Sequence, residues 1–155
     1  MHFCKEAIRF VVDGPPVGKG RPRFRVITAK STGRSFVNTY TPKESSSYEN
    51  LVKLSYRRSY GGPPHAEGPV GVGITAFFPI PKSWPKWKKE TAGSGLVRTE
   101  TKPDVDNILK AILDGLNGVA YSDDKQVYLR NCDKFYSLTP RVEVILFFEY
   151  PITKP

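Results

Sequence analysis

The chain has 155 residues, 39% of them hydrophobic, so it is long enough to bury the core of one domain of ordinary size. Its 13 glycines and 14 prolines indicate many loops, and no apolar run reaches the ~18 residues of a membrane-spanning helix. The two histidines (His2 and His65) and two cysteines (Cys4 and Cys132) lack zinc-ligand spacing, so we expect no zinc site. The N-terminus lacks the apolar segment of a signal peptide, and the cysteines are most simply reduced thiols of a cytoplasmic protein.

The positive charge of the chain is unevenly distributed. The net charge is +9, and the pI is about 9.6. Residues 1–103 carry 18 basic and 7 acidic side chains, a net charge of +11, whereas residues 104–155 carry 6 basic and 8 acidic side chains, a net charge of −2. The first part could therefore hold a polyanion such as nucleic acid, while the last part forms an acidic pocket. A basic surface that serves only solubility is the alternative.

The chain begins with a predicted strand and a glycine-rich loop. Ala7–Asp13 alternates loosely and contains β-branched residues, which is typical of a strand. Gly14–Gly20 must be a loop, because two prolines and three glycines disrupt regular structure. This loop is not a nucleotide-binding P-loop, because only three residues separate Gly14 from Gly18 and neither Ser nor Thr follows Lys19. Its glycines and lysine could still contact phosphates.

A basic hairpin is predicted next, so that residues 14–40 form a basic N-terminal segment. Residues 21–30 favour a strand with arginines at every second position, and Ser35–Tyr40 is its expected partner. A surface-exposed basic hairpin without a ligand is the alternative to DNA contact. The residues that we expect to contact DNA in this segment are Lys19, Arg21, Arg23 and Arg25.

Thr41–Tyr60 is predicted to be a helix. Thr41 suits the N-cap, Pro42 suits the first helical position, and Glu44 completes a capping box. Its inward face is expected to consist of Tyr48, Leu51, Val52, Ser55 and Tyr56.

A second basic segment, residues 81–102, follows the predicted strand Pro69–Ile80. Its first part, residues 81–95, suggests a short helix or lid, in which Trp84 and Trp87 either stack on bases or pack in the core. Further residues expected to contact DNA are Lys86, Lys88, Lys89, Lys102 and, on a later strand, Lys134.

The last third predicts a helix followed by two strands. The helix is expected over Val105–Gly115, with a turn at Asn117–Gly118. Strands are expected over Gln126–Tyr136 and Arg141–Tyr150. The whole pattern predicts an α+β fold, a single compact domain over residues 1–155 with a mixed β-sheet and two main helices packed on it. The helix residues that should face the sheet are Val105, Ile108, Leu109, Ile112, Leu113 and Leu116.

Acidic residues lie at both ends of this helix. Asp104 and Asp106 are at its start, and each has an ordinary structural explanation: Asp104 as an N-cap, and Asp106 as the i, i+4 salt-bridge partner of Lys110. Asp123 and Asp124 follow the turn, and such a pair folded beside two more carboxylates would need a cation.

The segment between Asp106 and Asp123 is long enough for the second acidic pair to return beside the helix start. An all-oxygen site of this kind would suit Mg²⁺, with Mn²⁺ as a substitute. The segment is not an EF-hand, because Leu109 stands where the glycine of that loop should be.

The block KPDVDNILKAILDGLNGVAYSDDKQV (102–127), with Lys134–Tyr136 after it, resembles the RusA-type Holliday junction resolvases of bacteria and their prophages. The early GPPVGKGRPR and the YTPKESSSYENLV helix resemble the phage-derived branch. The resemblance implies a RusA-like fold and a metal-dependent endonuclease that acts as a homodimer on four-way DNA junctions in recombination and repair. The catalytic residues that it implies are Asp104, Asp106, Lys110 and Asp124, with Asp123 as a less essential member of the metal-binding set.

The chemistry implied by the resemblance is hydrolysis of a phosphodiester by a metal-bound water, without a nucleotide cofactor or a membrane. Two alternatives remain open from the sequence. One is a DNA-binding phage protein without catalysis, and the other is a nuclease of the same chemistry that acts on flaps or replication forks.

Overall fold

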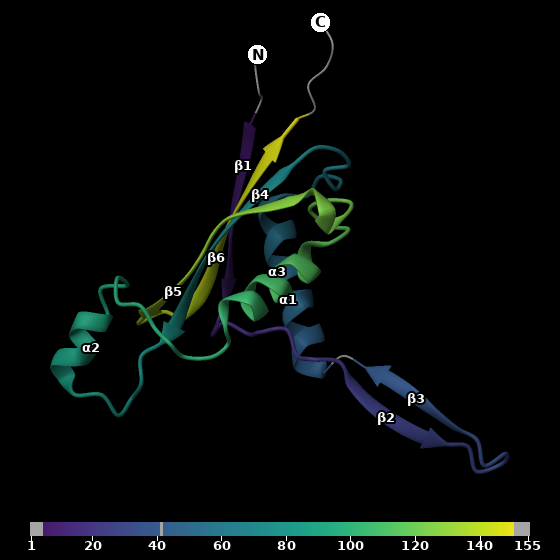
Figure 1. Cartoon of the computed structure of the whole chain (residues 1–155). Coiled ribbons are helices and arrows are strands. Elements are labelled where there is room, and N and C mark those ends of the chain that lie inside the picture. Colours follow the sequence, from purple (N-terminus) through teal and green to yellow (C-terminus); the bar gives the residue numbers. More distant parts are fainter. Residues whose placement is uncertain (1–4, 41, 151–155) are drawn as a thin grey trace, which may run out of the picture.

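The computed structural model describes residues 5–40 and 42–150 of the chain. Its centre is a four-stranded mixed sheet in the order β1-β6-β4-β5, covered on one face by two helices (Figure 1). The strands of this sheet are β1 (Lys5–Asp13), β4 (Val70–Pro79), β5 (Val127–Ser137) and β6 (Arg141–Glu149). The other elements are β2 (Arg23–Thr28), β3 (Ser35–Tyr40), α1 (Lys43–Ser59), α2 (Lys86–Ala92), α3 (Val105–Leu116) and the 3₁₀ turn η1 (Asp124–Gln126).

The sheet combines antiparallel and parallel pairing. β6 lies between β1 and β4 and is antiparallel to both, whereas β4 and β5 are parallel. A parallel pair needs a long crossover, and here the crossover contains α2 and α3. The alternation of β6 matches its position, because Val142, Val144, Leu146 and Phe148 are buried while the residues between them are partly exposed.

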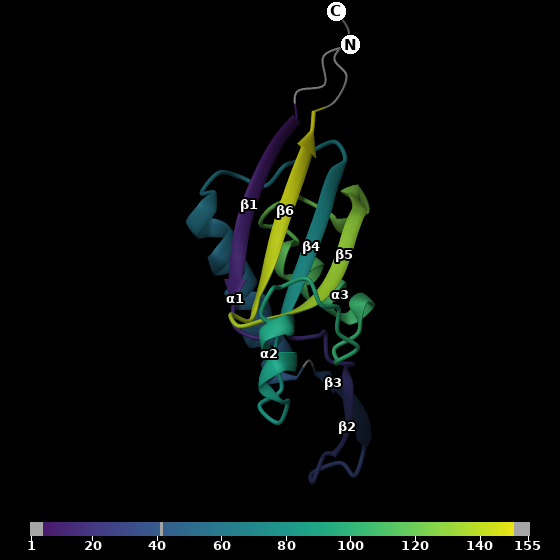
Figure 2. The same ribbon diagram turned by 90° about the vertical axis from the view of Figure 1, so that its left-hand side faces the viewer.

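The helices α1 and α3 lie together on one face of the sheet. Figure 2 shows the strands in front and both helices behind them. The buried residues of α3 include Ile108, Ile112 and Leu116, which recur at helical spacing. The two helices approach closely at Gly115, where an added Cβ would lie 2.8 Å from the Cβ of Val52 in α1. A side chain at this position would therefore separate the helices.

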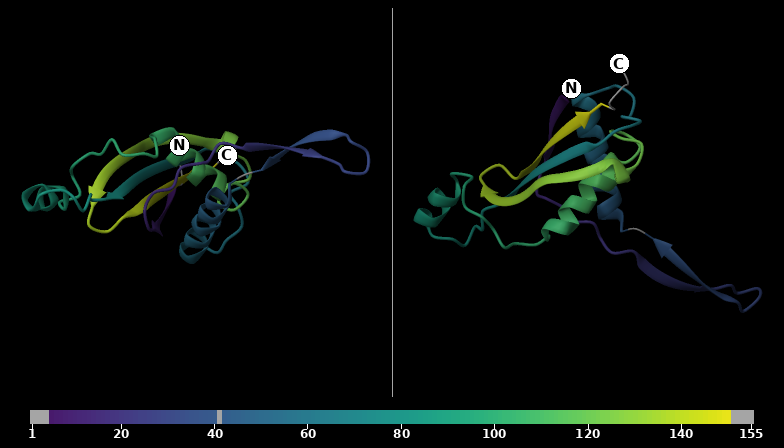
Figure 3. Two further views of the ribbon diagram at one scale, coloured as in Figure 1. Left: turned by 90° about the horizontal axis from the view of Figure 1, so that it is seen from below. Right: turned by 45° about the horizontal axis from the view of Figure 1, so that its top comes forward.

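Two appendages project from this core. The β2–β3 hairpin extends from one end of the molecule and α2 extends from the other (Figure 3). The hairpin is exposed on both faces: Phe24 has 73% of its surface exposed and Phe36 has 54%. These segments therefore add surface to the molecule without adding to its core.

The predicted fold class and the predicted strands are confirmed, with three differences in detail. α1 begins at Lys43, so Pro42 is its N-cap and not its first helical residue, and no side chain caps this end. Arg21 lies before β2 rather than within it. Val105, which the sequence predicts to face the sheet, is 40% exposed. Thr41 is outside the described residues.

None of the helices in the described ranges is both long and apolar enough to cross a bilayer.

The close contact between α1 and α3 predicts that Gly115→Ala will destabilise the protein. The new methyl group overlaps Val52, and overpacking of this kind costs about 1–3 kcal/mol, only partly offset by the better helix propensity of alanine. Gly61→Ala is the matched control, because a Cβ there would meet nothing within 4 Å. Urea denaturation measures both variants, and equal stabilities would contradict this account of the packing.

Candidate active site

A cleft of about 460 Å³ lies where the N-terminus of α3 meets the glycine-rich loop and the base of the β2–β3 hairpin. Asp104 lines it, and so do three of the basic residues that the sequence assigns to DNA contact: Lys19, Arg23 and Lys102. Residues from four separate parts of the chain therefore meet around Asp104, and Glu44 is a second acidic residue in the lining.

The two carboxylates at the start of α3 have none of the structural partners that their positions suggest. Asp104 is the N-cap residue, but its side chain makes no capping hydrogen bond. Asp106 lies in the first turn, and no ion pair joins it to Lys110 in the described part of the chain. Asp104, Asp106 and Lys110 are all exposed. Both carboxylates are therefore available to a ligand, and neither is accounted for by helix stability.

The glycine-rich loop is held tightly against the start of α3. A Cβ at Gly18 would lie 2.6 Å from the Cβ of Pro103, so only glycine fits there. The backbone N–H of Lys19 donates to the carbonyl of Asn107 at 3.0 Å, and that of Gly20 donates to Ser45 Oγ at 2.8 Å. These two N–H groups are satisfied by the protein, and so they serve the position of the loop rather than phosphate contact.

Lys19 joins the two main helices electrostatically. Its ammonium donates to a carboxylate oxygen of Glu49 in α1 and lies 3.0 Å from the carboxylate of Asp114 in α3. Partial burial lowers the pKa of Lys19, but the hydrogen bonds to Glu49 and Asp114 and their charges outweigh it, so the pKa is raised above 10.5. The charge of Lys19 is thus compensated inside the fold, a role that the sequence did not indicate.

The second acidic pair lies in the turn η1 and the residue before it. The Asp123 carboxylate accepts from the backbone N–H of Lys125 at 2.9 Å, while Gln126 Oε1 accepts from the N–H of Asp123 at 3.0 Å. These bonds form a capping box, and the hydrogen bond from Lys125 is the main reason that the pKa of Asp123 is lowered. Asp124 is exposed and has no such capping role.

The two acidic pairs lie at opposite ends of α3. The Tyr121 hydroxyl donates to the carbonyl of Leu113 at 2.8 Å, and its pKa is raised by burial and also by the charges of Asp124 and Asp114. Asp124 therefore lies near the C-terminal end of the helix (Figure 1), whose 12 residues rise by ~18 Å.

The expected return of the second acidic pair to the helix start does not occur within one chain. Across residues 5–40 and 42–150, no three His, Cys, Asp or Glu side chains are grouped closely enough to hold a metal ion. The helix itself imposes this separation, because it extends continuously from Asp104 to Asn117 and the chain turns back only after it. One chain therefore presents Asp104 and Asp106 at the start of α3, and Asp123 and Asp124 at the other end of the helix.

Of the other basic residues that the sequence assigns to DNA contact, some are exposed to solvent and others contact groups of the protein. Arg21, Arg23 and Arg25 are exposed at the hairpin. On α2, Lys88 lies 3.8 Å from the ring centre of Trp84, and Lys134 on β5 donates to the carbonyl of Thr101. The exposed residues Lys86 and Glu90 approach to 3.9 Å, and Lys89 is partly buried.

The two tryptophans have different environments. Trp84 packs edge-on against Tyr136, with 4.9 Å between ring centres, and is partly buried against the core. Trp87 has 68% of its surface exposed on α2. The packing alternative thus describes Trp84, while Trp87 remains available for stacking.

The ion pairs of Lys19 predict a pH-dependent loss of stability in Lys19→Met. The substitution leaves Glu49 and Asp114 without their shared cation, and we expect a cost of about 1–3 kcal/mol at neutral pH. Because the pKa of Lys19 is raised on folding, its contribution is complete below 10.5 and declines as the pH rises through the higher folded value. The difference from the wild type in urea denaturation should therefore shrink above that pH.

Lys102→Met is the matched control, because Lys102 lines the same cleft and is exposed. Its stability should lie within about 0.5 kcal/mol of the wild type. Equal costs for the two substitutions would contradict the special role of Lys19.

Comparison with known proteins identifies the family of the chain. The family model described as "Endodeoxyribonuclease RusA" matches residues 13–146. The "Uncharacterized protein YqaN" of Bacillus subtilis (strain 168) is 39% identical over 143 residues, which cover 91% of this chain and 96% of that protein. The family match spans the glycine-rich loop, both acidic pairs, β4, β5 and most of β6, but only the last residue of β1. The chain therefore belongs to the RusA endodeoxyribonuclease family.

Proposed function

We propose that this protein is a divalent-metal-dependent endonuclease that resolves four-way DNA junctions by paired phosphodiester hydrolysis. The observation that carries the proposal is the pair of exposed carboxylates at the start of α3, Asp104 and Asp106, which make no cap and no ion pair in the described chain. Asp104 lines a cleft together with Arg23 and Lys102. Carboxylates without a structural role beside basic residues favour a shared ligand that is both phosphate-bearing and metal-binding.

The donor set at the start of α3 fits a hard cation. Mg²⁺ is commonly held by one or two carboxylates together with water and substrate phosphate oxygens, and Asp104 and Asp106 supply such a pair. When bound, the ion would lower the pKa of a coordinated water and offset the charge on phosphate oxygens. Mn²⁺ should substitute for it, since it accepts the same ligands.

The remaining residues of the site act by position and charge. Arg23 and Lys102 face the same cleft as Asp104, so they would bind the phosphates on either side of the scissile bond. Lys110 lies one helical turn after Asp106, and its exposed ammonium would stabilise negative charge that develops on the phosphate during hydrolysis. The exposed arginines of the hairpin and the residues of α2 extend the basic surface along the DNA.

We further propose that Asp124 reaches this site from a second copy of the chain. A paired cut needs two sites related by symmetry, which a two-fold dimer supplies. The edge strand β5 supports such a dimer, because in the described structure the backbone pairing on its outer side is confined to the bridge between Phe135 and Arg98. Its exposed portion includes Leu129, which is 50% exposed.

Antiparallel pairing of two β5 strands would bring the acidic pairs together. Asp124 comes just before the first residue of β5. The start of α3 lies beside the middle of β5, since the carbonyl of Val105 is 3.8 Å from Cys132 Sγ. These two positions are ~16 Å apart along the strand. A two-fold axis between them would bring Asp124 of each copy close to Asp104 and Asp106 of the other.

Loss of either carboxylate at the start of α3 should stop cleavage but preserve binding. Asp104→Asn and Asp106→Asn each remove a metal ligand, so we expect a loss of at least about a hundredfold in junction cleavage. Junction affinity should stay the same or increase, because negative charge beside the phosphates is removed. Asp123→Asn is the control, since this carboxylate serves as a cap, and it should retain most of the activity. Normal cleavage by Asp104→Asn in Mg²⁺ would refute the assignment.

Mixed dimers test whether Asp124 acts in the partner's site. Dimers that combine an Asp104→Asn chain with an Asp124→Asn chain keep one intact site if the residues meet between chains, and none if they meet within a chain. We therefore expect nicking activity to reappear on mixing these two inactive variants. A mixture of Asp104→Asn and Asp106→Asn chains should stay inactive in either arrangement. Failure of the first mixture, with mixed dimers verified by mass spectrometry, would overturn the arrangement.

The substrate is tested with labelled four-way junction, flap and plain duplex, each with and without Mg²⁺. We expect symmetric nicks in the junction only, and binding that weakens steeply with salt because phosphate contacts dominate. Cleavage of the flap alone would indicate a flap or fork nuclease of the same chemistry. Binding without cleavage under all conditions would indicate a DNA-binding protein without catalysis.

A further inference from the structure

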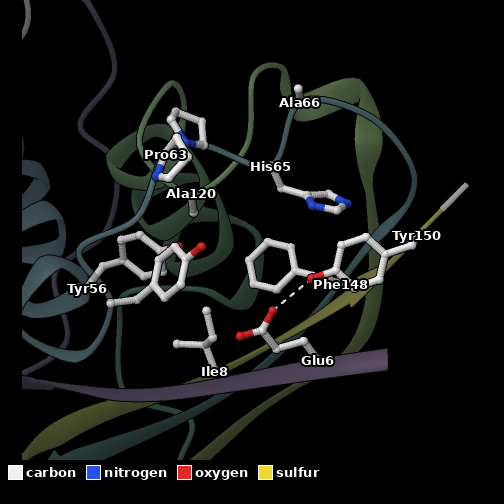
Figure 4. A pocket seen from close by; sticks show the side chains of 11 residues that line it. Glu6, Ile8, Tyr56, Pro63, His65, Ala66, Ala120, Phe148 and Tyr150 are labelled. Atoms are coloured by element: carbon white, nitrogen blue, oxygen red, sulfur yellow. Dashed lines mark hydrogen bonds between the residues drawn. The ribbon is translucent and has the colours of Figure 1, made fainter. Parts of the chain in front are cut away.

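A second cavity, of about 180 Å³, lies between the start of β1, the end of β6, α1 and the loop after it (Figure 4). It shares no lining residue with the active-site cleft. The proposed nuclease chemistry gives this cavity no role.

Aromatic rings form most of its wall. His65 lies 5.0 Å from Phe148 and 5.4 Å from Tyr150 between ring centres, and Tyr56 and Tyr60 lie 5.8 Å apart on the α1 side. Figure 4 shows the rings of His65, Phe148 and Tyr150 around one side of the cavity, with Glu6 below them. Rings grouped in this way present π-electron density that attracts cations.

The cavity has one fixed negative charge. Glu6 is the acidic residue among its described lining residues, and none of these is Lys or Arg. The Tyr150 hydroxyl donates to Glu6 Oε2 at 2.9 Å and so holds the carboxylate in place. In Figure 4 the second carboxylate oxygen is directed away from Tyr150, toward the Tyr56 side of the cavity. An anion would be repelled here, and a cation would find an oriented carboxylate.

Tyr56 supplies a second polar group without a protein partner. The residue is fully buried, and its hydroxyl makes no hydrogen bond with any other described residue. Burial, then the charges of Tyr60 and Glu6, raise the pKa of Tyr56 to about 12, so the group remains a neutral phenol. A buried hydroxyl left unpaired is unfavourable, and because Tyr56 lines the cavity, a donor bound there could satisfy its oxygen.

We propose that this cavity binds an alkylammonium or alkylguanidinium group. Such a group carries only donors, which match the Glu6 carboxylate and the Tyr56 oxygen, and a charge that suits the aromatic wall. The cavity accommodates the head group with a few methylenes. The group comes either from a Lys or Arg side chain of a protein partner or from a free organic cation.

The test is titration of the ¹⁵N-labelled full chain with ethylguanidinium chloride at constant ionic strength. We expect saturable shifts in the amides of His65 and Ala120, with about tenfold weaker binding in Glu6→Gln. Glu67→Gln is the matched control, because Glu67 lies two positions after the lining residue His65 but does not itself line the cavity. n-Butanol, an uncharged probe of similar size, should produce no saturable shift. Equal binding by Glu6→Gln and the wild type, or by n-butanol and the cation, would overturn the proposal.

Tyr56→Phe provides an independent readout. Removal of an unpaired buried hydroxyl should leave stability unchanged or raise it, while the affinity for ethylguanidinium falls. A variant that is as stable as the wild type and binds with unchanged affinity would contradict the role of the hydroxyl. A blocked Ala-Arg-Ala peptide distinguishes the two sources: tighter binding than free ethylguanidinium assigns the cavity to a side chain of a partner, and weaker binding assigns it to a free cation.

Discussion

The arrangement of the active-site cleft depends on the attachment of one short loop to two helices. Lys19 lies between Glu49 of α1 and Asp114 of α3, so its ammonium pairs with one carboxylate on each helix. These ion pairs hold the loop that carries Lys19. Gly18 lets that loop approach Pro103 too closely for any side chain. The backbone just before α3, and with it Asp104, is thereby held against the base of the basic hairpin.

Asp104 and Asp106 make no capping bond or ion pair in the described chain, whereas neighbouring acidic residues have structural partners. Asp114 pairs with Lys19, Asp123 caps η1, and Asp133 accepts from Arg98 at 2.8 Å. Clustered carboxylates with structural partners are ordinary, and it is the unpartnered ones that indicate a ligand. This distinction is visible only in three dimensions, since all of these residues look alike in sequence.

Much of the fold follows from local patterns, and much of the site does not. Alternation predicts β6, and the glycine and proline content of residues 14–20 predicts a loop, because local sterics decide both. The partner of Lys19 is not predictable in this way, because Glu49 lies 30 positions away and nothing local signals it. Pro42 is the N-cap of α1 and has no side-chain capping bond, whereas Thr41, the expected cap, lies outside the described residues.

The distance between the acidic pairs could have been anticipated from helix geometry alone. A continuous helix of 12 residues separates its ends by ~18 Å, and a turn placed after its last residue leaves the following side chains at the far end. The sequence spacing sufficed for a return, but the chain uses η1 to enter β5 immediately. Sequence separation sets only the maximum reach of a chain, whereas the elements between two residues decide their actual distance.

The β2–β3 hairpin bears on how such a protein diversifies. Its strands pair only with each other, and its apolar side chains are exposed rather than packed on the central sheet. Lengthening, shortening or replacing this arm would therefore leave the folding of the remainder nearly untouched. The sequence of this arm can therefore change during evolution without loss of the folded core, and the surface that the protein presents can change with it.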